Sequence, residues 1–371
     1  MSMKESNSKM GSIDFILFSA IMILVAVGVV MVYSASSYSA FFSKAYNYDS
    51  MFFLKKQGLS AIIGITAMFF MIKIDYHKIK KFTKVIMLLT IILLCVVFAF
   101  PPINGARRWI PIPVFNLQPS EIAKYVIVLY MAKSIEAKGE KIKSFLYGIM
   151  PYLMVSGLYA GLVIAEKNLS IATVIMLVTL ILLFVGGARW MHFIQLIGVV
   201  GVFGTLGIIL EPYRLDRFKS FLDPWKDPKG DGYQLIQSLL ALGSGGITGV
   251  TLGKSRQKAY YIPEPHNDFI FSIIGEELGL IGCTVIIILF LIVIWRGIRT
   301  AIRAKDTYGT LLAVGTTSVI AIQAIINIAV VSGSMPVTGV PLPFISYGGS
   351  SLLFNLMAMG ILLNVSRQCS S

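Results

Sequence analysis

Ionisable side chains at membrane depth are the residues of this sequence that could carry chemistry. Glu121 and Lys124 lie inside a long apolar stretch, Asp268 stands at the start of another, and Glu276 and Glu277 follow about two turns deeper. Each such group costs about 2.5–3.5 kcal/mol or more at the centre of a bilayer. Glu121 and Lys124 are three residues apart, so they share a helix face and can neutralise each other. This pair is either a structural ion pair that locks two helices or part of a reactive site.

Asp268 is the candidate general base, because a carboxylate at the mouth of a membrane span can take a proton from a hydroxyl group. The alternative for this residue is an N-cap of the following helix. Glu276 and Glu277 stand between two glycines and are typical of packing or pairing groups. His266 has Glu264 and Asp268 nearby, but their spacing does not match that of metal ligands. We therefore predict no metal site there.

Cations accompany these carboxylates on the predicted outer loops. Arg107 and Arg108 stand next to the aromatic Trp109. Further cations lie on the longest loop, namely Arg214, Arg217, Lys219, Lys254, Arg256 and Lys258. Each one alone is suited to a lipid headgroup. Together they predict a basic mouth around Asp268 that suits a phosphate or pyrophosphate group, as the transfer of a group from a lipid phosphate requires.

The elements that must position these residues are membrane helices. The chain has 371 residues, of which 56% are hydrophobic and 13% charged, and its mean hydropathy is +0.79. This composition excludes a soluble globular enzyme, and the long continuous apolar runs exclude an outer-membrane barrel. Because about 20 apolar residues cross a bilayer as a helix, we predict about ten spans in an all-α polytopic membrane protein. They are expected at residues 13–35, 57–72, 83–100, 117–133, 145–163, 169–187, 191–210, 268–295, 308–332 and 346–365.

The distribution of Lys and Arg orients this predicted bundle. Most of those on short loops fall on the side of the N-terminus, which predicts a plasma-membrane protein with both termini in the cytoplasm. The same bias accounts for the net charge of +14, so we expect no binding to nucleic acid. The first apolar run is expected to be an anchor rather than a removed signal peptide. We predict one integral membrane domain over residues 1–371.

A long extracytoplasmic loop, residues 211–267, is predicted between spans seven and eight. Residues 233–242 within it are typical of an interfacial helix. The apolar face of this helix carries Leu235, Ile236, Leu239 and Leu240. Glycines are frequent over the next residues, 243–253, which predicts either a flexible connector or a mobile flap over a site.

Four strings of this sequence together resemble one known family. They are FKSFLDPWKDPKGDGYQLIQSLLALGSGGITGVTLGKSRQKAYYIPEPHNDFIFSIIGEELGLIG at 218–282, NGARRWI at 104–110, QPSEIAK at 118–124 and TGVPLPFISYGGSS at 338–351. In this order they resemble the SEDS proteins (shape, elongation, division and sporulation) over nearly the whole chain. The DPWKDPKGDGYQLIQSL and PEPHNDFIF wording is more similar to the FtsW and SpoVE branch than to the RodA branch.

The resemblance implies a peptidoglycan glycosyltransferase for cell division or sporulation. Such an enzyme joins disaccharide-pentapeptide units carried on undecaprenyl pyrophosphate (lipid II) into glycan strands at the outer face of the membrane. The family motif implies Asp268 as the catalytic residue. It also implies Trp109, Glu121, Lys124 and the turn around Gly348 as parts of the cavity. The implied partner is a class B penicillin-binding protein, a transpeptidase that crosslinks the strand, together with other membrane proteins of division or sporulation.

Two positions depart from the family pattern. Asn267 stands where Thr is common before the catalytic Asp, a polar exchange that should leave the backbone unchanged. Residues 165–170 read AEKNLS where many relatives contain a Pro. Glu166 is therefore left out of the predicted catalytic set.

The implied reaction needs a base for the acceptor hydroxyl and positive charge for the departing pyrophosphate. We predict Asp268 as the base and Lys124, held by Glu121, as the cation that faces the pyrophosphate or orients Asp268. The predicted substrate-binding residues are Arg107, Arg108, Trp109, Arg217, His266, Ser346 and Gly348. Attack from the face opposite the leaving group predicts inversion at the sugar carbon. No residue cluster demands a cofactor, and a divalent cation, Mg²⁺ or Mn²⁺, that bridges the pyrophosphate is compatible with this chemistry.

Two other functions fit part of the pattern. A lipid II flippase would also place charges at membrane depth, but a transporter of this type often has two inverted halves, whereas the long loop divides this chain unevenly. A scaffold that only recruits a penicillin-binding protein would leave the charges inside the spans unexplained.

Overall fold

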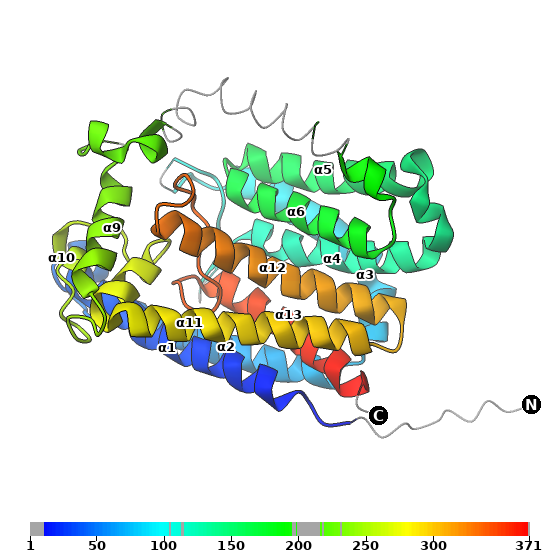
Figure 1. The fold of residues 1–371 in the computed structure, drawn as a ribbon, viewed down its shortest axis with the longest axis horizontal. Coiled ribbons are helices and arrows are strands. Elements are labelled where there is room, and N and C mark those ends of the chain that lie inside the picture. Colours follow the sequence, from blue (N-terminus) through cyan, green and yellow to red (C-terminus); the bar gives the residue numbers. More distant parts are fainter. Residues whose placement is uncertain are drawn as a thin grey trace, which may run out of the picture.

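The computed structural model describes residues 11–369 except 104, 113–114, 195–197, 199–215, 217–218 and 231. Long helices lie side by side in one bundle (Figure 1). They are α1 (Phe15–Phe41), α2 (Phe52–Lys73), α3 (Tyr76–Val96), α4 (Pro119–Lys138), α5 (Met150–Ala165), α6 (Leu169–Val185), α11 (Ile270–Arg303), α12 (Thr307–Val331) and α13 (Gly349–Cys369). Two further helices, α9 (Tyr233–Gly245) and α10 (Gln257–Tyr260), lie at one end of the bundle. Short 3₁₀ turns cover Lys44–Tyr46, Val97–Ala99, Gly139–Lys143 and Pro224–Lys226, a π turn covers Phe145–Ile149, and β1 (Ile110–Pro111) pairs antiparallel with β2 (Asn116–Leu117).

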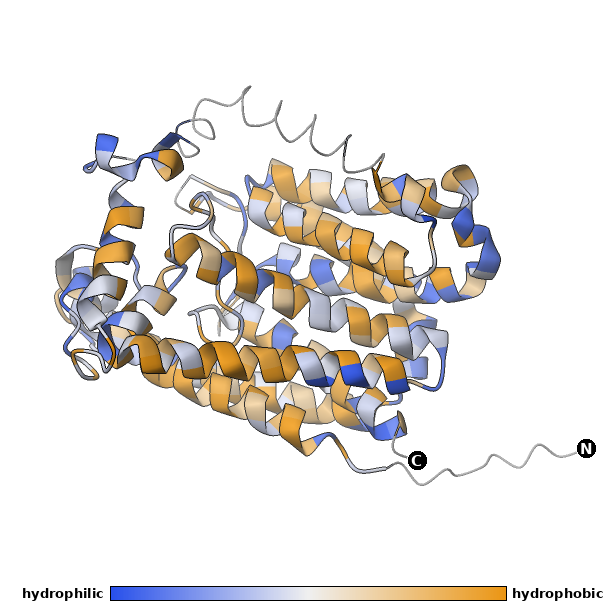
Figure 2. Cartoon of the chain, viewed as in Figure 1, coloured by the Kyte–Doolittle hydropathy of each residue, from blue (hydrophilic) through white to orange (hydrophobic). Residues whose placement is uncertain are grey.

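The hydropathy of the bundle is that of a membrane protein. Hydrophobic positions dominate the lengths of the helices, and hydrophilic ones gather toward the two ends (Figure 2). In the described part of the chain, six helical segments are long and apolar enough to cross a membrane, and the shorter helix α6 is also apolar. The expected helical architecture, with several helices long and apolar enough to cross a membrane, is confirmed.

Most of the predicted spans coincide with a helix, but their ends differ. Helix α3 begins at Tyr76 rather than at residue 83, and α11 continues to Arg303 rather than ending at residue 295. The reason is that these terminal turns carry Lys and Arg, which apolar windows exclude although such residues are good helix formers. The expected span 191–210 lies largely outside the described residues.

Aspartates begin three of the helices at the end of the bundle where the described chain starts and finishes. The Asp14, Asp75 and Asp306 side chains accept hydrogen bonds from backbone N–H groups in the first turns of α1, α3 and α12. Such N-caps each contribute about 1 kcal/mol. Asp14 also pairs with Arg296 at 2.6 Å, which joins α1 to α11. Arg367 Nε on α13 donates to the Gly11 carbonyl at 2.9 Å, so both ends of the described chain lie together on one side of the bundle (Figure 1).

The predicted helix in the long loop is present as α9, and it packs onto the bundle. Leu235 and Ile236 are buried, and α9 packs against α11 and α12. The glycine-rich segment that follows lies directly against α11: a Cβ atom on Gly249 (φ +81°) would stand 2.2 Å from the carbonyl oxygen of Glu277. Main-chain hydrogen bonds join residues 246–251 to 276–281, where Gly279 (φ +66°) interrupts the α11 helix. This segment is therefore packed in place and is not a loose connector.

Candidate active site

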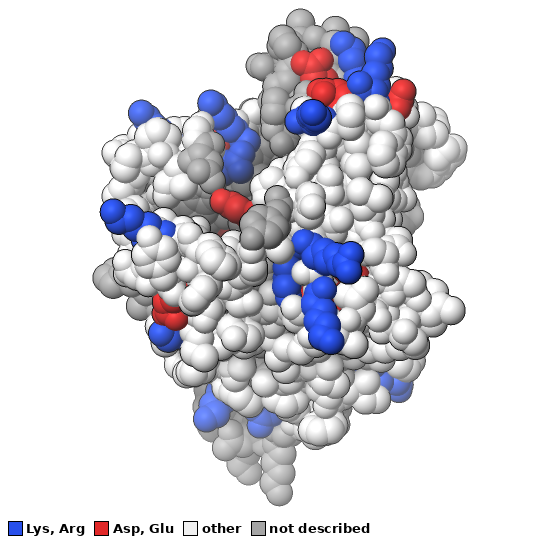
Figure 3. Space-filling view, turned by 90° about the vertical axis from the view of Figure 1, so that its left-hand side faces the viewer, with Lys and Arg blue, Asp and Glu red and all other residues white. Residues whose placement is uncertain are grey.

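A large pocket opens at the end of the bundle that carries α9 and α10. Its volume is about 1530 Å³, and it is lined by the start of α4, the turn between α5 and α6, and the loops that precede α11 and α13. Figure 3 shows this end of the molecule with acidic side chains in a hollow and with Lys and Arg side chains around it. Six predicted site residues line the pocket: Arg108, Trp109, Glu121, His266, Asp268 and Gly348.

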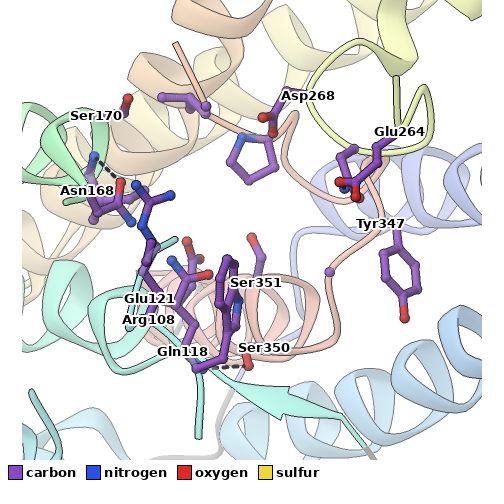
Figure 4. A pocket seen from close by; sticks show the side chains of 18 of the residues that line it. Arg108, Gln118, Glu121, Asn168, Ser170, Glu264, Asp268, Tyr347, Ser350 and Ser351 are labelled. Atoms are coloured by element: carbon purple, nitrogen blue, oxygen red, sulfur yellow. Dashed lines mark hydrogen bonds between the residues drawn. The ribbon is translucent and has the colours of Figure 1, made fainter. Parts of the chain in front are cut away.

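Asp268 is half-buried in the loop that leads into α11, and it lines the pocket. The N-cap position of α11 belongs to Phe269, which makes no side-chain capping bond, so the N-cap alternative for Asp268 is wrong. Its carboxylate lies close to Gly339, since a Cβ atom built on this glycine would be 3.4 Å from Asp268 Oδ2. Asp268 lies across the pocket from Arg108 and Glu121 (Figure 4).

Glu121 and Lys124 form the predicted ion pair in the first turns of α4. Lys124 Nζ is 2.8 Å from Glu121 Oε2, and both side chains are buried. Pro119 starts the helix, and the partial positive charge of its N-terminus favours the Glu121 carboxylate there. Glu121 lines the pocket, whereas Lys124 lies behind it and also donates to Gln323 Oε1 on α12 at 3.0 Å.

Arg107 and Arg108, on the loop between α3 and α4, differ in their contacts. Arg108 lines the pocket and donates from Nε to the Glu166 carbonyl oxygen at 3.1 Å, and it also donates to the carbonyl of Lys167. Arg107 is exposed, donates to the Phe98 carbonyl at 2.9 Å and is not a lining residue. Arg217 lies outside the described residues.

The cations of the long loop also differ from the expected basic mouth. Lys254 and Arg256 are exposed, but Lys258 is buried. Lys258 Nζ pairs with Glu277 Oε1 on α11 at 2.6 Å and donates to Ser34 Oγ on α1 at 3.1 Å. The interpretation of Glu277 as a pairing group is confirmed. Lys258 is buried in an ion pair inside the protein and does not contribute to the predicted basic mouth.

His266 is held between two aromatic rings in the loop before Asp268. Its ring centroid is 4.2 Å from that of Phe53 and 5.5 Å from that of Tyr347, and its backbone carbonyl accepts from the Tyr347 N–H at 2.9 Å. Burial lowers the pKa of His266 to about 4, so the ring is neutral at physiological pH. Through its contacts with Phe53 and Tyr347, the ring attaches the Asp268 loop to α2 and to the loop before α13.

Ser346 and Gly348 lie on the turn that leads into α13. The Ser346 hydroxyl is buried and accepts from the Leu342 N–H at 2.8 Å, so it shapes the turn. Gln57 on α2 donates to the Ser346 carbonyl and accepts from the Gly348 N–H. Gly348 lines the pocket, and Ser346 is not among the lining residues.

Comparison with known proteins places this chain in a family. Residues 14–371 match the FtsW, RodA and SpoVE family, described as "Cell cycle protein". The chain belongs to this family. The resemblance to SEDS proteins, which carry these names, is thereby confirmed.

Relatives in this family match over almost their full length. The chain is 46% identical over 366 residues to stage V sporulation protein E of Bacillus subtilis (strain 168), which covers 97% of this chain and 98% of that protein. It is 44% identical over 358 residues to a probable peptidoglycan glycosyltransferase FtsW of Geobacter sp. (strain M18), with 95% and 96% covered. These names bear out the sequence-based expectation of a division or sporulation protein.

Solved structures show the same fold. A chain from a peptidoglycan synthase complex that coordinates polymerization and crosslinking matches with a TM-score of 0.79 and 26% identity, covering 96% of this chain and 98% of that one. Rod shape determining protein RodA of Thermus thermophilus matches with a TM-score of 0.71 and 25% identity, covering 97% and 98%.

Glu166 was left out of the predicted catalytic set, but the structure places it at the pocket end of α5, in contact with Arg108 through its backbone. It follows α5 directly and is fully buried, and the Ser120 hydroxyl and the Arg108 guanidinium lie near its carboxylate. Burial raises the pKa of Glu166 to about 8, against the opposing effect of the Arg108 guanidinium. In the sequence, a carboxylate directly after an apolar helix indicates a candidate site residue. It was discounted because this segment lacks the Pro that many relatives contain.

Two buried amides on α12 were also missed. Gln323 contacts Lys124, and Asn327 contacts the backbone of Asp268. Both stand in an apolar span, one turn apart, where amides need internal partners. That spacing was visible in the sequence, but the partners on other helices were not.

Proposed function

We propose that this protein is a peptidoglycan glycosyltransferase that polymerises lipid II at the extracytoplasmic face of the membrane. The observation that carries the proposal is the pocket at the loop end of an apolar helical bundle, which has Asp268 on one side and Arg108 and Glu121 across from it. The curated relatives, several of which are named peptidoglycan glycosyltransferase, support the same reaction.

The proposed topology has ten spans, with the loop 211–267 between spans seven and eight on the outside. The described chain begins and ends on one side of the bundle, as an even number of crossings requires. The pocket lies at the opposite end. With both termini in the cytoplasm, as the Lys and Arg bias predicts, the pocket faces the extracytoplasmic side. We propose that residues 1–371 form one membrane domain.

In the proposed reaction, Asp268 removes the proton from the acceptor hydroxyl, and the hydroxyl oxygen attacks the sugar carbon. The bond from that carbon to the pyrophosphate of the donor breaks, and the pyrophosphate keeps the electron pair. Attack from the face opposite the leaving group inverts the sugar carbon. Arg108 supplies positive charge at the pocket wall for the departing pyrophosphate, which becomes more negative as the bond breaks.

The buried pair in α4 has a supporting part in this reaction. Lys124 lies behind Glu121, so we propose that it acts by holding the Glu121 carboxylate oriented toward the pocket. Trp109 and Gly348 form a part of the pocket wall that contacts the substrate. Ser346 and His266 hold the turns that shape this wall. Arg107 and Arg217 remain proposed contacts for the lipid-linked phosphate.

A transpeptidase partner and a divalent cation belong to this proposal. A solved structure of similar fold comes from a complex that coordinates polymerization and crosslinking, which supports a class B penicillin-binding protein as the partner. Among the residues that the structure describes, no group of three His, Cys, Asp or Glu side chains is arranged to hold a metal. We propose that a divalent cation, Mg²⁺ or Mn²⁺, would be bound by the pyrophosphate of the substrate and would offset its negative charge.

Reconstitution tests the proposed function. The full-length protein in lipid nanodiscs, with and without its class B penicillin-binding protein, is given fluorescent lipid II, and the products are separated on a gel. Long glycan is the expected product. Absence of polymer under both conditions, together with movement of lipid II across vesicles that contain the protein, would instead establish a flippase. If the protein neither polymerised lipid II nor moved it across vesicles, the scaffold that recruits a penicillin-binding protein would be the remaining function.

A further inference from the structure

Two buried amide side chains lie one turn apart on α12. Gln323 and Asn327 share one face of this helix, and their side chains are almost completely inaccessible to solvent. Gln323 bonds to Lys124 on α4, and Asn327 bonds to the loop that carries Asp268. We propose that this amide pair fixes Asp268 relative to the Glu121–Lys124 pair, so that both amides are positioning residues for the transfer reaction. The inference rests on the proposed function.

Asn327 holds two loops of the pocket with one nitrogen atom. Its Nδ2 donates to the carbonyl oxygen of Asp268 at 2.7 Å and to that of Val340 at 2.8 Å. Gly339, the neighbour of Val340, is the residue that lies beside the Asp268 carboxylate. The same amide thus fixes the backbone that bears the carboxylate and the wall beside it.

Gln323 holds the opposite side of the pocket. Its Oε1 accepts from Lys124 Nζ at 3.0 Å, and Lys124 in turn donates to Glu121 Oε2 at 2.8 Å. Helix α12 packs against both α4 and α11. Because a helix rises 1.5 Å per residue, the two attachment points are about 6 Å apart along a rigid axis. Helix α12 therefore links the carboxylate on one side to the charge pair on the other.

The partners show which end of each amide matters. An ammonium group only donates and a carbonyl oxygen only accepts, so Gln323 must present its oxygen to Lys124 and Asn327 its nitrogen to the two carbonyls. The remaining atoms, Gln323 Nε2 and Asn327 Oδ1, have no hydrogen-bond partner among the described residues. A buried polar atom without a partner is destabilising. Gln323 thus serves as the acceptor of one hydrogen bond, and Asn327 serves as the donor of two.

This difference predicts opposite outcomes for two similar substitutions. Gln323→Glu keeps the acceptor for Lys124, whereas Asn327→Asp replaces the donor with oxygens that face two carbonyls. Displacement of reacting groups by about 1 Å costs about a hundredfold in rate, so we expect kcat to fall about ten- to a hundredfold in Asn327→Asp, Asn327→Leu and Gln323→Leu. Gln323→Glu should keep several times the kcat of Gln323→Leu. If the reaction only required buried amides in general, Gln323→Glu and Asn327→Asp would lower kcat equally.

Asn364 on α13 provides a matched control. It is also fully buried, and its Nδ2 donates to a main-chain carbonyl, that of Ile72, at 2.7 Å. It accepts from the N–H of Tyr76, at the end of the bundle opposite the pocket. Asn364→Leu should lower the thermal-unfolding temperature without lowering the kcat of the folded protein.

The experiment measures kcat and KM separately for the full-length variants in nanodiscs with the transpeptidase, using synthetic fluorescent lipid II, after normalising to the folded fraction. The inference predicts a fall in kcat with little change in KM, and recovery in Gln323→Glu alone. Equal losses in Gln323→Glu and Gln323→Leu, or a loss confined to KM, would overturn it. If the position 327 variants do not fold, the two position 323 variants decide. An inactive wild-type protein would refute the proposed function, whereas an active wild type with fully active variants would refute only this inference.

Discussion

The buried pair between Lys258 and Glu277 gives a prediction whose size follows from the contacts. Glu277 is fully buried, and its two carboxylate oxygens accept from Ser34 Oγ at 2.8 and 2.6 Å and from Lys258 Nζ at 2.6 Å. Lys258→Met removes the only cation of this cluster among the described residues and leaves a buried carboxylate with hydroxyl and N–H donors. Breaking a buried pair in this way costs about 3–5 kcal/mol.

Hydrogen exchange of the long loop measures this cost. Each 1.4 kcal/mol is a factor of ten, so protection of residues 255–262 should fall about a hundred- to a few-thousand-fold in Lys258→Met. The double variant Lys258→Met with Glu277→Gln removes both charges of the pair and keeps an acceptor for Ser34, so most of the protection should return. Lys254→Met, an exposed lysine of the same loop, is the matched control and should behave as wild type.

Two results would refute this reasoning. If Lys258→Met exchanged at the wild-type rate, the pair would not hold the loop on α11. If the double variant were no better protected than the single one, the loss would come from packing of the lysine stem rather than from the unpaired charge of Glu277.

Further predictions concern the groups that surround the pocket. The pKa of Glu166 is raised from 4.5 to about 8, so the folded protein holds a proton that the unfolded chain has released, and stability should fall as pH rises between those values. Glu166→Gln should remove this slope when unfolding temperatures at pH 5 and pH 9 are compared, and an unchanged slope would contradict the assignment. Gly249→Ala should be more destabilising than Gly246→Ala: both positions have positive φ, which costs about 1–2 kcal/mol for alanine, but only the first Cβ would collide with a carbonyl. Equal shifts in unfolding temperature would show that the contact with α11 is unimportant.

Sequence patterns predicted contacts within one element better than contacts between elements. The Glu121–Lys124 pair followed from a spacing of three on one helix, and its geometry is as expected. The helix in the long loop followed from its apolar face. Helix ends were missed where charged turns continue past the apolar core, as in the first turns of α3.

Long-range partners could not be predicted in the same way. Lys258 was grouped with the loop cations because nothing near it in sequence identifies Glu277 and Ser34 as its partners. Asn327 and Asp268 are likewise joined only by the packing of α12 against α11. A single sequence shows which residues need a partner, but only the fold shows which partner they have.

The most direct test of the central claim is the rate of lipid II polymerisation by Asp268→Asn. This substitution keeps the size of the side chain and removes the proposed base, so the rate should fall at least about a hundredfold while insertion and folding are unchanged. Asp49→Asn is the matched control, because Asp49 pairs with Lys55 and does not line the pocket. The control should polymerise at nearly the wild-type rate. Near-normal glycan synthesis by Asp268→Asn would contradict the account.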